Sequence, residues 1–120
     1  MKVAVSVQGT TLDDPMDERF GRAARFIIYD LEDETYKLLD NQQVYNAPQG
    51  AGIQAAQNVI NAGAEAIITG HVGPKAFRVL KSTDVSVHLA RKITVQEAIT
   101  SFKEGTLETA ETNDVEDHWV

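Results

Sequence analysis

Short segments in which apolar residues cluster, or alternate with polar ones, predict five β-strands. These segments span residues 2–8, 25–31, 36–45, 66–69 and 85–89. The second and third segments are joined by the polar residues 32–35, and so short a connection predicts an antiparallel hairpin. In the last segment Val85, Val87 and Leu89 share one face, as expected of a strand that packs against a core.

Apolar residues spaced three and four positions apart predict three helices. The helices are expected at residues 51–62, at residues 74–80, and from the hydroxyl of Thr94 up to Gly105, which closes the last helix. Pro74 suits the first position of a helix, and Thr94 and Glu97 have the spacing of a capping box. Because a helix connects the fourth and fifth strands, these two strands are expected to be parallel. The order β-β-β-α-β-α-β-α predicts an α/β fold in which helices flank a five-stranded mixed sheet.

The length of the chain suits a single domain. Its 120 residues are 42% hydrophobic, which is enough for one core, whereas two separate domains would each be marginal. Residues 103–120 contain six acidic side chains and one lysine, with no apolar period. We therefore expect a domain over residues 1–105 and an acidic tail over residues 106–120. This tail is expected to cross the surface or stay disordered, with Trp119 as its one candidate anchor, and to be dispensable for folding.

Composition and charge disfavour several classes of protein. No apolar run approaches 18 residues and no leader peptide is present, so we expect neither a membrane span nor secretion, and a cytoplasmic location. The absence of cysteine leaves imidazole, carboxylates or exogenous groups as metal ligands. The net charge of −7 disfavours a nucleic-acid partner, although Arg19, Arg22 and Arg25 could form one local positive patch.

The glycine turn between the fourth strand and the second helix is the leading candidate for a ligand site. Gly70 and Gly73 bracket His71, and Lys75 follows in the first turn of the helix. Backbone amides at a helix start carry partial positive charge, and glycines let an anion approach them closely. The turn therefore predicts contact with an anionic ligand.

Two further groups are expected at the same edge of the sheet, where strand carboxyl ends meet helix amino ends. Gly50 and Gly52 open the first helix and offer additional backbone amides. Arg19 and Arg22 carry guanidinium groups that suit a carboxylate- or phosphate-bearing ligand. The alternative for both arginines is pairing with the acids of their own loop, which are Asp13, Asp14, Asp17 and Glu18.

Histidine offers the only strong metal-binding side chain in the glycine turn, so His71 is the candidate metal ligand. The alternative is a surface histidine that hydrogen-bonds within its own loop. His88 alternates with Val87 and Leu89, and we expect it to face solvent or a partner. Neither glycine turn ends in Gly-Lys-Ser/Thr, which disfavours ATP as a ligand.

Five segments, taken together, resemble the dinitrogenase iron-molybdenum cofactor biosynthesis family. They are MKVAVSVQG, ERFGRAARFIIYD, NAPQGAGIQAA, ITGHVGPKAFRVL and TVQEAITSFKEGTL, and they occur in the family's order and spacing over residues 1 to about 108. The family commonly has a histidine before the Phe-Gly pair, where this chain has Arg19.

The resemblance implies a ribonuclease-H-like fold and a non-enzymatic carrier of the iron-molybdenum cofactor, an iron–sulfur precursor or a similar anionic metal cluster. It implies partners among nitrogenase-assembly or other metalloproteins, and a monomer or small homo-oligomer. The alternative is a regulatory or interaction module that binds a small anionic metabolite or a partner protein without metal. The first strand lacks the carboxylates of a ribonuclease-H-type nuclease, which favours a binding protein over an enzyme.

Overall fold

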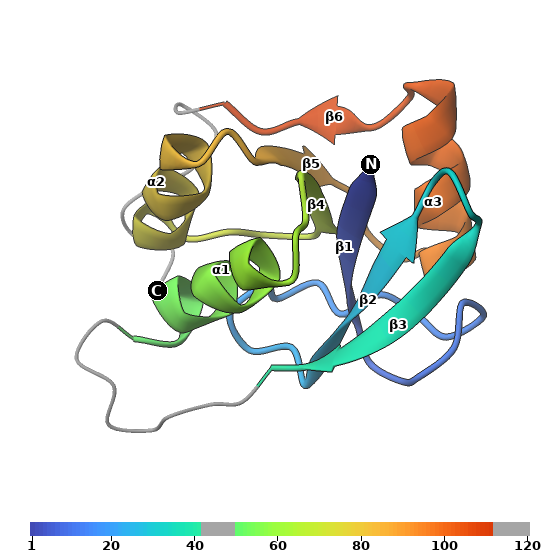
Figure 1. The fold of residues 1–120 in the computed structure, drawn as a ribbon, viewed down its shortest axis with the longest axis horizontal. Coiled ribbons are helices and arrows are strands. Elements are labelled where there is room, and N and C mark those ends of the chain that lie inside the picture. The colour runs from blue at the N-terminus through green and yellow to red at the C-terminus, as the bar shows by residue number, and fades with distance from the viewer. Residues whose placement is uncertain (42–49, 112–120) are drawn as a thin grey trace.

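A computed structural model describes residues 1–41 and 50–111 (Figure 1). The elements are β1 (Lys2–Val7), β2 (Arg25–Asp30), β3 (Thr35–Asp40), α1 (Ala51–Asn61), β4 (Ala66–Thr69), α2 (Pro74–Ser82), β5 (Ser86–Leu89), α3 (Val95–Glu104) and β6 (Glu108–Thr109). The predicted α/β order is confirmed through α3. The predicted third strand was longer, but its last residues lie outside the described ranges.

The strands form one mixed sheet in the order β3-β2-β1-β4-β5-β6. The hairpin of β2 and β3 is antiparallel, β2 is antiparallel to β1, and β1, β4 and β5 are mutually parallel. Both the predicted hairpin and the predicted parallel pair are confirmed. Among the described residues, no helix is long and apolar enough to cross a lipid bilayer.

The prediction of a five-stranded sheet is wrong, because a sixth strand lies inside the segment that we expected to be a tail. In β6, Glu108 and Thr109 pair antiparallel with Leu89 and His88 of β5. The next residue, Ala110, is buried, and its amide donates to the carbonyl of Val87 over 2.8 Å. Backbone pairing and one small buried side chain hold this strand, and neither leaves an apolar pattern in the sequence.

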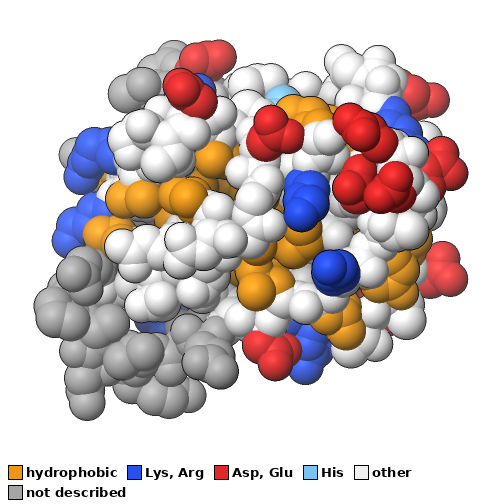
Figure 2. Space-filling model, viewed as in Figure 1, with side chains coloured by type: hydrophobic (Ala, Val, Ile, Leu, Met, Phe, Trp, Pro, Cys, Tyr) orange, Lys and Arg blue, Asp and Glu red, His pale blue; other side chains and the backbone are white. Residues whose placement is uncertain are grey.

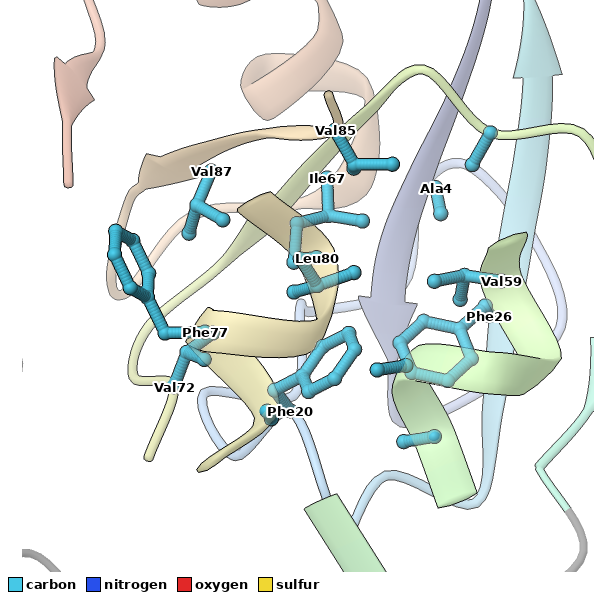
Figure 3. Close-up of a cluster of buried hydrophobic side chains, with 14 of the residues drawn as sticks. Ala4, Phe20, Phe26, Val59, Ile67, Val72, Phe77, Leu80, Val85 and Val87 are labelled. Carbon is cyan, nitrogen blue, oxygen red and sulfur yellow. The ribbon is translucent and has the colours of Figure 1, made fainter. Parts of the chain in front are cut away.

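Two apolar cores lie on opposite faces of the sheet, with α1 and α2 on one face and α3 on the other (Figure 1). The α1–α2 core surrounds Phe20, Phe26, Ile67 and Leu80 (Figure 3). The α3 core contains alternate residues of the same strands, together with Val95, Ala98 and Ile99 of α3. The five residues that follow Lys2 in β1 are all buried because β1 lies inside the sheet and is covered on both faces.

Candidate functional site

The carboxyl ends of the parallel strands β1, β4 and β5 meet the amino ends of α1 and α2 along one edge of the fold, which we call the rim. Ligands of α/β proteins commonly bind at such an edge. The two helix starts touch there, because a Cβ atom added to Gly52 of α1 would lie 3.3 Å from the Cβ of Ala76 in α2. The structure therefore brings together the two predicted glycine segments, residues 50–52 and 70–73.

The loop of residues 17–22 lies against both segments. The amide of Phe20 donates to the carbonyl of His71 over 3.2 Å, and a Cβ atom on Gly21 would lie 3.0 Å from the Cα of Gly52. Phe20 is only 1% exposed, and its ring lies 5.3 Å from that of Phe26 in the α1–α2 core (Figure 3). This buried ring anchors the loop at the rim and places Arg19 beside His71.

Gly70 allows two chain segments to pack together. A Cβ atom at Gly70 would lie 2.6 Å from the Cβ of Glu18 and 2.8 Å from its backbone oxygen. Glu18 fills the space that this glycine leaves. An anion therefore cannot approach Gly70 from that side, contrary to the expectation from the sequence. The role of Gly70 in this structure is to let the loop of residues 17–22 reach the rim.

The starts of α1 and α2 have no side-chain caps. Gly50, with φ 89°, precedes α1, and Gly73, with φ −72° and ψ 163°, precedes α2; neither helix has an acidic residue in its first turn. Within residues 1–41 and 50–111, the first amides of each helix therefore have no N-cap side chain and no first-turn carboxylate as acceptor. By contrast, α3 begins with the predicted capping box, in which Thr94 accepts from the amide of Glu97 over 3.1 Å.

Three cationic side chains lie at or beside these helix starts. The Nε atom of Arg19 lies 3.5 Å from Oδ1 of Asp17, so the alternative of a pair within its own loop is confirmed for this arginine. The Arg19 side chain is nevertheless 70% exposed. Arg22 and Lys75 are exposed and make no hydrogen bond or ion pair within the described parts of the chain. The rim thus combines uncapped amides with positive charge.

His71 is partly buried between the loop and the glycine turn. Burial lowers the pKa of its imidazole below the ordinary value of 6.5, and the nearby positive charge of Arg91 lowers the pKa further. At neutral pH the ring is therefore uncharged, which is the form that binds metals. The assignment of His71 as a metal ligand stays a prediction.

The donor set of the rim suits an anion better than a bare cation. Within residues 1–41 and 50–111, no three histidine or acidic side chains come close enough together to hold a metal ion. Backbone amides, guanidinium groups and an ammonium group are hydrogen-bond donors, and none of them ligates a cation. A metal could fit this rim if it brought its own anionic ligands, as a metal–sulfur cluster does.

Arg91 is a rim residue that the sequence interpretation missed. Its Nε and Nη2 atoms donate to the carbonyl of Gly70 over 3.2 and 3.1 Å. The guanidinium thereby fixes the end of β4 and adds positive charge beside His71. No local pattern marks this role, because the two partners are 21 residues apart.

A buried polar cluster supports the rim from below. The hydroxyl of Ser6 donates to the carbonyl of Asp17, and the hydroxyl of Thr69 lies 2.9 Å from the Oγ atom of Ser6. Asp17 also accepts from the amide of Arg19 over 2.9 Å. Every buried side-chain nitrogen or oxygen of the described residues has a partner, so this cluster is a structural support.

His88 does not face solvent, which corrects its expected position. It is partly buried, its ring lies 4.9 Å from the ring of Phe102 in an edge-on contact, and its Nε2 atom lies 2.9 Å from Oγ of Ser86. The helix α3 covers this residue. The third histidine, His118, lies outside the described residues.

Comparisons with known proteins agree with this architecture. The model of a family described as dinitrogenase iron-molybdenum cofactor matches residues 1–105. An uncharacterised protein of Methanocaldococcus jannaschii is 32% identical over 111 residues, which cover 90% of each chain. The residues 1–105 that match the family model include the whole rim.

Two solved structures are similar to the chain over nearly its whole length. The apo form of the orange protein from Desulfovibrio gigas is 37% identical, with a TM-score of 0.85 over 91% of this chain and 92% of that one. A putative NifB protein from Thermotoga is 34% identical, with a TM-score of 0.77 over 90% and 91% of the two chains. The chain belongs to the dinitrogenase iron-molybdenum cofactor family.

Proposed function

We propose that this protein is a non-enzymatic carrier that holds an anionic metal cluster at the rim. The observation that supports this proposal most is the contact of two uncapped helix starts at Gly52 and Ala76, with Arg22 and Lys75 nearby. An anion placed there would accept hydrogen bonds from the first amides of both helices. The family suggests the iron-molybdenum cofactor or an iron–sulfur precursor as the cluster. The ribonuclease-H-like classification belongs to the same proposal.

The residues of the chain would act by binding and orienting the cluster. The amides of α1 and α2, Arg19, Arg22 and Lys75 would neutralise its negative charge, and the uncharged His71 would supply one ligand to a metal atom. Two features favour a carrier over an enzyme. Residues 3–7 of β1 are buried and contain no carboxylate, and the hydroxyl of Ser6 is engaged by Asp17.

Anaerobic titration with isolated iron-molybdenum cofactor, followed by visible absorption, tests this proposal. We expect a saturable change at micromolar protein, and its loss in the double variant R22Q/K75Q. The matched control K2Q/K37Q removes two exposed cations that lie away from the rim and should bind like the wild type. The absence of a saturable change in the wild type would contradict the proposal.

A second candidate is a regulatory or interaction module that binds a small anionic metabolite without metal. Two features favour it: the described residues hold no set of three metal ligands, and Arg19 stands where the family resemblance leads us to expect a histidine. A thermal-shift screen separates the two candidates. Stabilisation by phosphate or carboxylates that survives the substitution His71→Ala supports the module, whereas stabilisation by the cofactor that is lost in this variant supports the carrier.

A further inference from the structure

The helix α2 carries a row of cations whose charge is not balanced locally. Lys75, Arg78 and Lys81 recur every third residue, all three are exposed, and α2 contains no acidic residue. None of them makes an ion pair or hydrogen bond with the described residues. We call these three side chains the α2 cation row. Lys and Arg side chains lie beside α2 at the left edge of Figure 2.

Some other cations of the described chain do have acidic partners within ion-pair distance. Arg25 lies 3.9 Å from Asp40, and Lys103 lies 3.8 Å from Glu34. The α2 cation row is therefore an unbalanced positive surface in a chain whose net charge is −7. The sequence after residue 110 has the opposite character, with four acidic residues and no lysine or arginine, namely Glu111, Asp114, Glu116 and Asp117.

The described chain ends on the same side of the sheet as α2. Ala110 is 2% exposed and belongs to the α1–α2 core together with Phe77 and Leu80 of α2. Its amide donates to the carbonyl of Val87, which holds the end of the described chain against β5. Residues 112–120, at about 3.3 Å per residue, would span about 30 Å if extended. The nine residues of α2 span only about 13 Å, so the remaining chain is long enough to follow the whole helix.

We propose that the α2 cation row is the docking surface for the acidic residues 112–120, and that this segment competes with an anionic ligand for the rim. The competition rests on the proposed function, whereas the docking does not. The family match ends at residue 105, before this segment begins. Lys75 belongs both to the row and to the rim, which links the two events.

The docking is expected to be weak and sensitive to salt. Each exposed ion pair contributes about 0–1 kcal/mol, and ions screen such pairs. Covalent attachment compensates for this weakness, because a short tether gives an effective concentration of about 1 mM. The result is a segment that a multiply charged ligand can displace.

Trp119 is the only tryptophan of the chain, and its fluorescence anisotropy reports the docking without a ligand. At about 10 mM salt we expect higher anisotropy in the wild type than in R78Q/K81Q, with the difference lost at about 1 M salt. The control K2Q/K37Q removes two exposed cations elsewhere and should match the wild type. Equal anisotropy of the wild type and R78Q/K81Q at low salt would overturn the docking.

The competition is tested with a chain truncated after Glu111. At low salt this chain should bind isolated iron-molybdenum cofactor about two- to tenfold more tightly than the full chain, since the tethered competitor is gone. Equal affinities would overturn the competition. If neither chain binds the cofactor, the proposed function fails, but the Trp119 measurement still decides whether the segment docks.

Discussion

The helices on the two faces of the sheet differ in how their ends are capped. On one face, α3 begins with a capping box at Thr94 and is followed by Gly105 with φ 72°, so side chains and a left-handed turn satisfy both of its ends. On the other face, α1 and α2 begin at Gly50 and Gly73 without side-chain caps or acidic residues. The helix on one face is capped by its own side chains, whereas the two helices on the other face start without a side-chain cap.

The uncapped starts of α1 and α2 are positioned by tertiary packing rather than by caps. The uncapped starts are held in place by packing around Phe20, Gly21 and Gly52. An anion-binding site needs donors that are fixed before the ligand arrives, and local packing supplies this without using the donors themselves. If so, the stability near the rim should depend on close packing, whereas the stability of α3 should depend on its capping box.

The substitution Gly70→Val should destabilise the protein most. Its Cβ atom would clash with the Cβ and backbone oxygen of Glu18, and overpacking of this kind costs about 1–3 kcal/mol. Urea unfolding measures the loss. The control is Gly63→Ala, at a glycine whose added Cβ meets only the end of the Lys2 side chain, at 3.7 Å, but whose φ is 88°. Backbone strain alone thus acts in the control, and wild-type stability of Gly70→Val would contradict the clash.

Truncation after Gly105 should also lower stability, because it removes β6 and the buried Ala110. The loss of this pairing and burial is expected to cost about 1–2 kcal/mol in urea unfolding. Truncation after Glu111 keeps both features and should leave the free energy of unfolding nearly unchanged. Wild-type stability in the chain that ends at Gly105 would restore the simpler expectation that all of residues 106–120 are dispensable.

The substitution Thr94→Ala should destabilise the protein by about 1 kcal/mol, because it removes the side-chain acceptor of the capping box. The thermal unfolding midpoint measures this change. Cofactor affinity should stay at its wild-type level, since α3 lies on the opposite face of the sheet. A change in affinity at constant stability would show that the two faces are coupled.

Acidification should produce the smallest of these effects through His88. Burial lowers its pKa below the ordinary value of 6.5, and the charge of Lys81 lowers it further. The stability that the neutral ring contributes is therefore present above pH 6.5 and is lost as the pH falls below that value. Between pH 7.5 and 5, the unfolding midpoint should fall less in His88→Gln than in the wild type. The same fall in both would exclude His88 as a source of the pH dependence.

Most of the fold could be predicted because its elements have local signals. The strand of residues 66–69 and the helix that starts at Pro74 appear as expected, because a β-branched run and a proline act over a few residues. β6 could not be predicted, since its two residues, Glu108 and Thr109, are polar and exposed. Its pairing depends on the free edge of β5, which only the assembled sheet creates.

The candidate site could be predicted only in outline. The glycines and cations of the rim were visible, but the contact between Gly70 and Glu18 joins segments 52 residues apart and leaves no pattern in either. The role of Arg91 was hidden for the same reason. Local sequence therefore indicates which groups can bind an anion, whereas tertiary packing decides which glycines stay open to it.

The substitution Gly73→Asp tests most directly whether an anionic ligand uses the uncapped start of α2, since it gives this helix the cap that it lacks. The backbone at Gly73 has the extended conformation of an N-cap, which aspartate adopts without strain. The new carboxylate would accept from the first amides of α2, raising stability by a few tenths to about 1 kcal/mol and opposing an anion at the same place.

The measurement is the calorimetric affinity for isolated iron-molybdenum cofactor in Gly73→Asp and in the control Gly73→Ala, which adds a Cβ atom without a cap. We predict that the alanine variant binds like the wild type, whereas the aspartate variant is at least as stable as the wild type and does not bind. Wild-type affinity in the aspartate variant would contradict the account, because the cofactor would then not use the open start of α2.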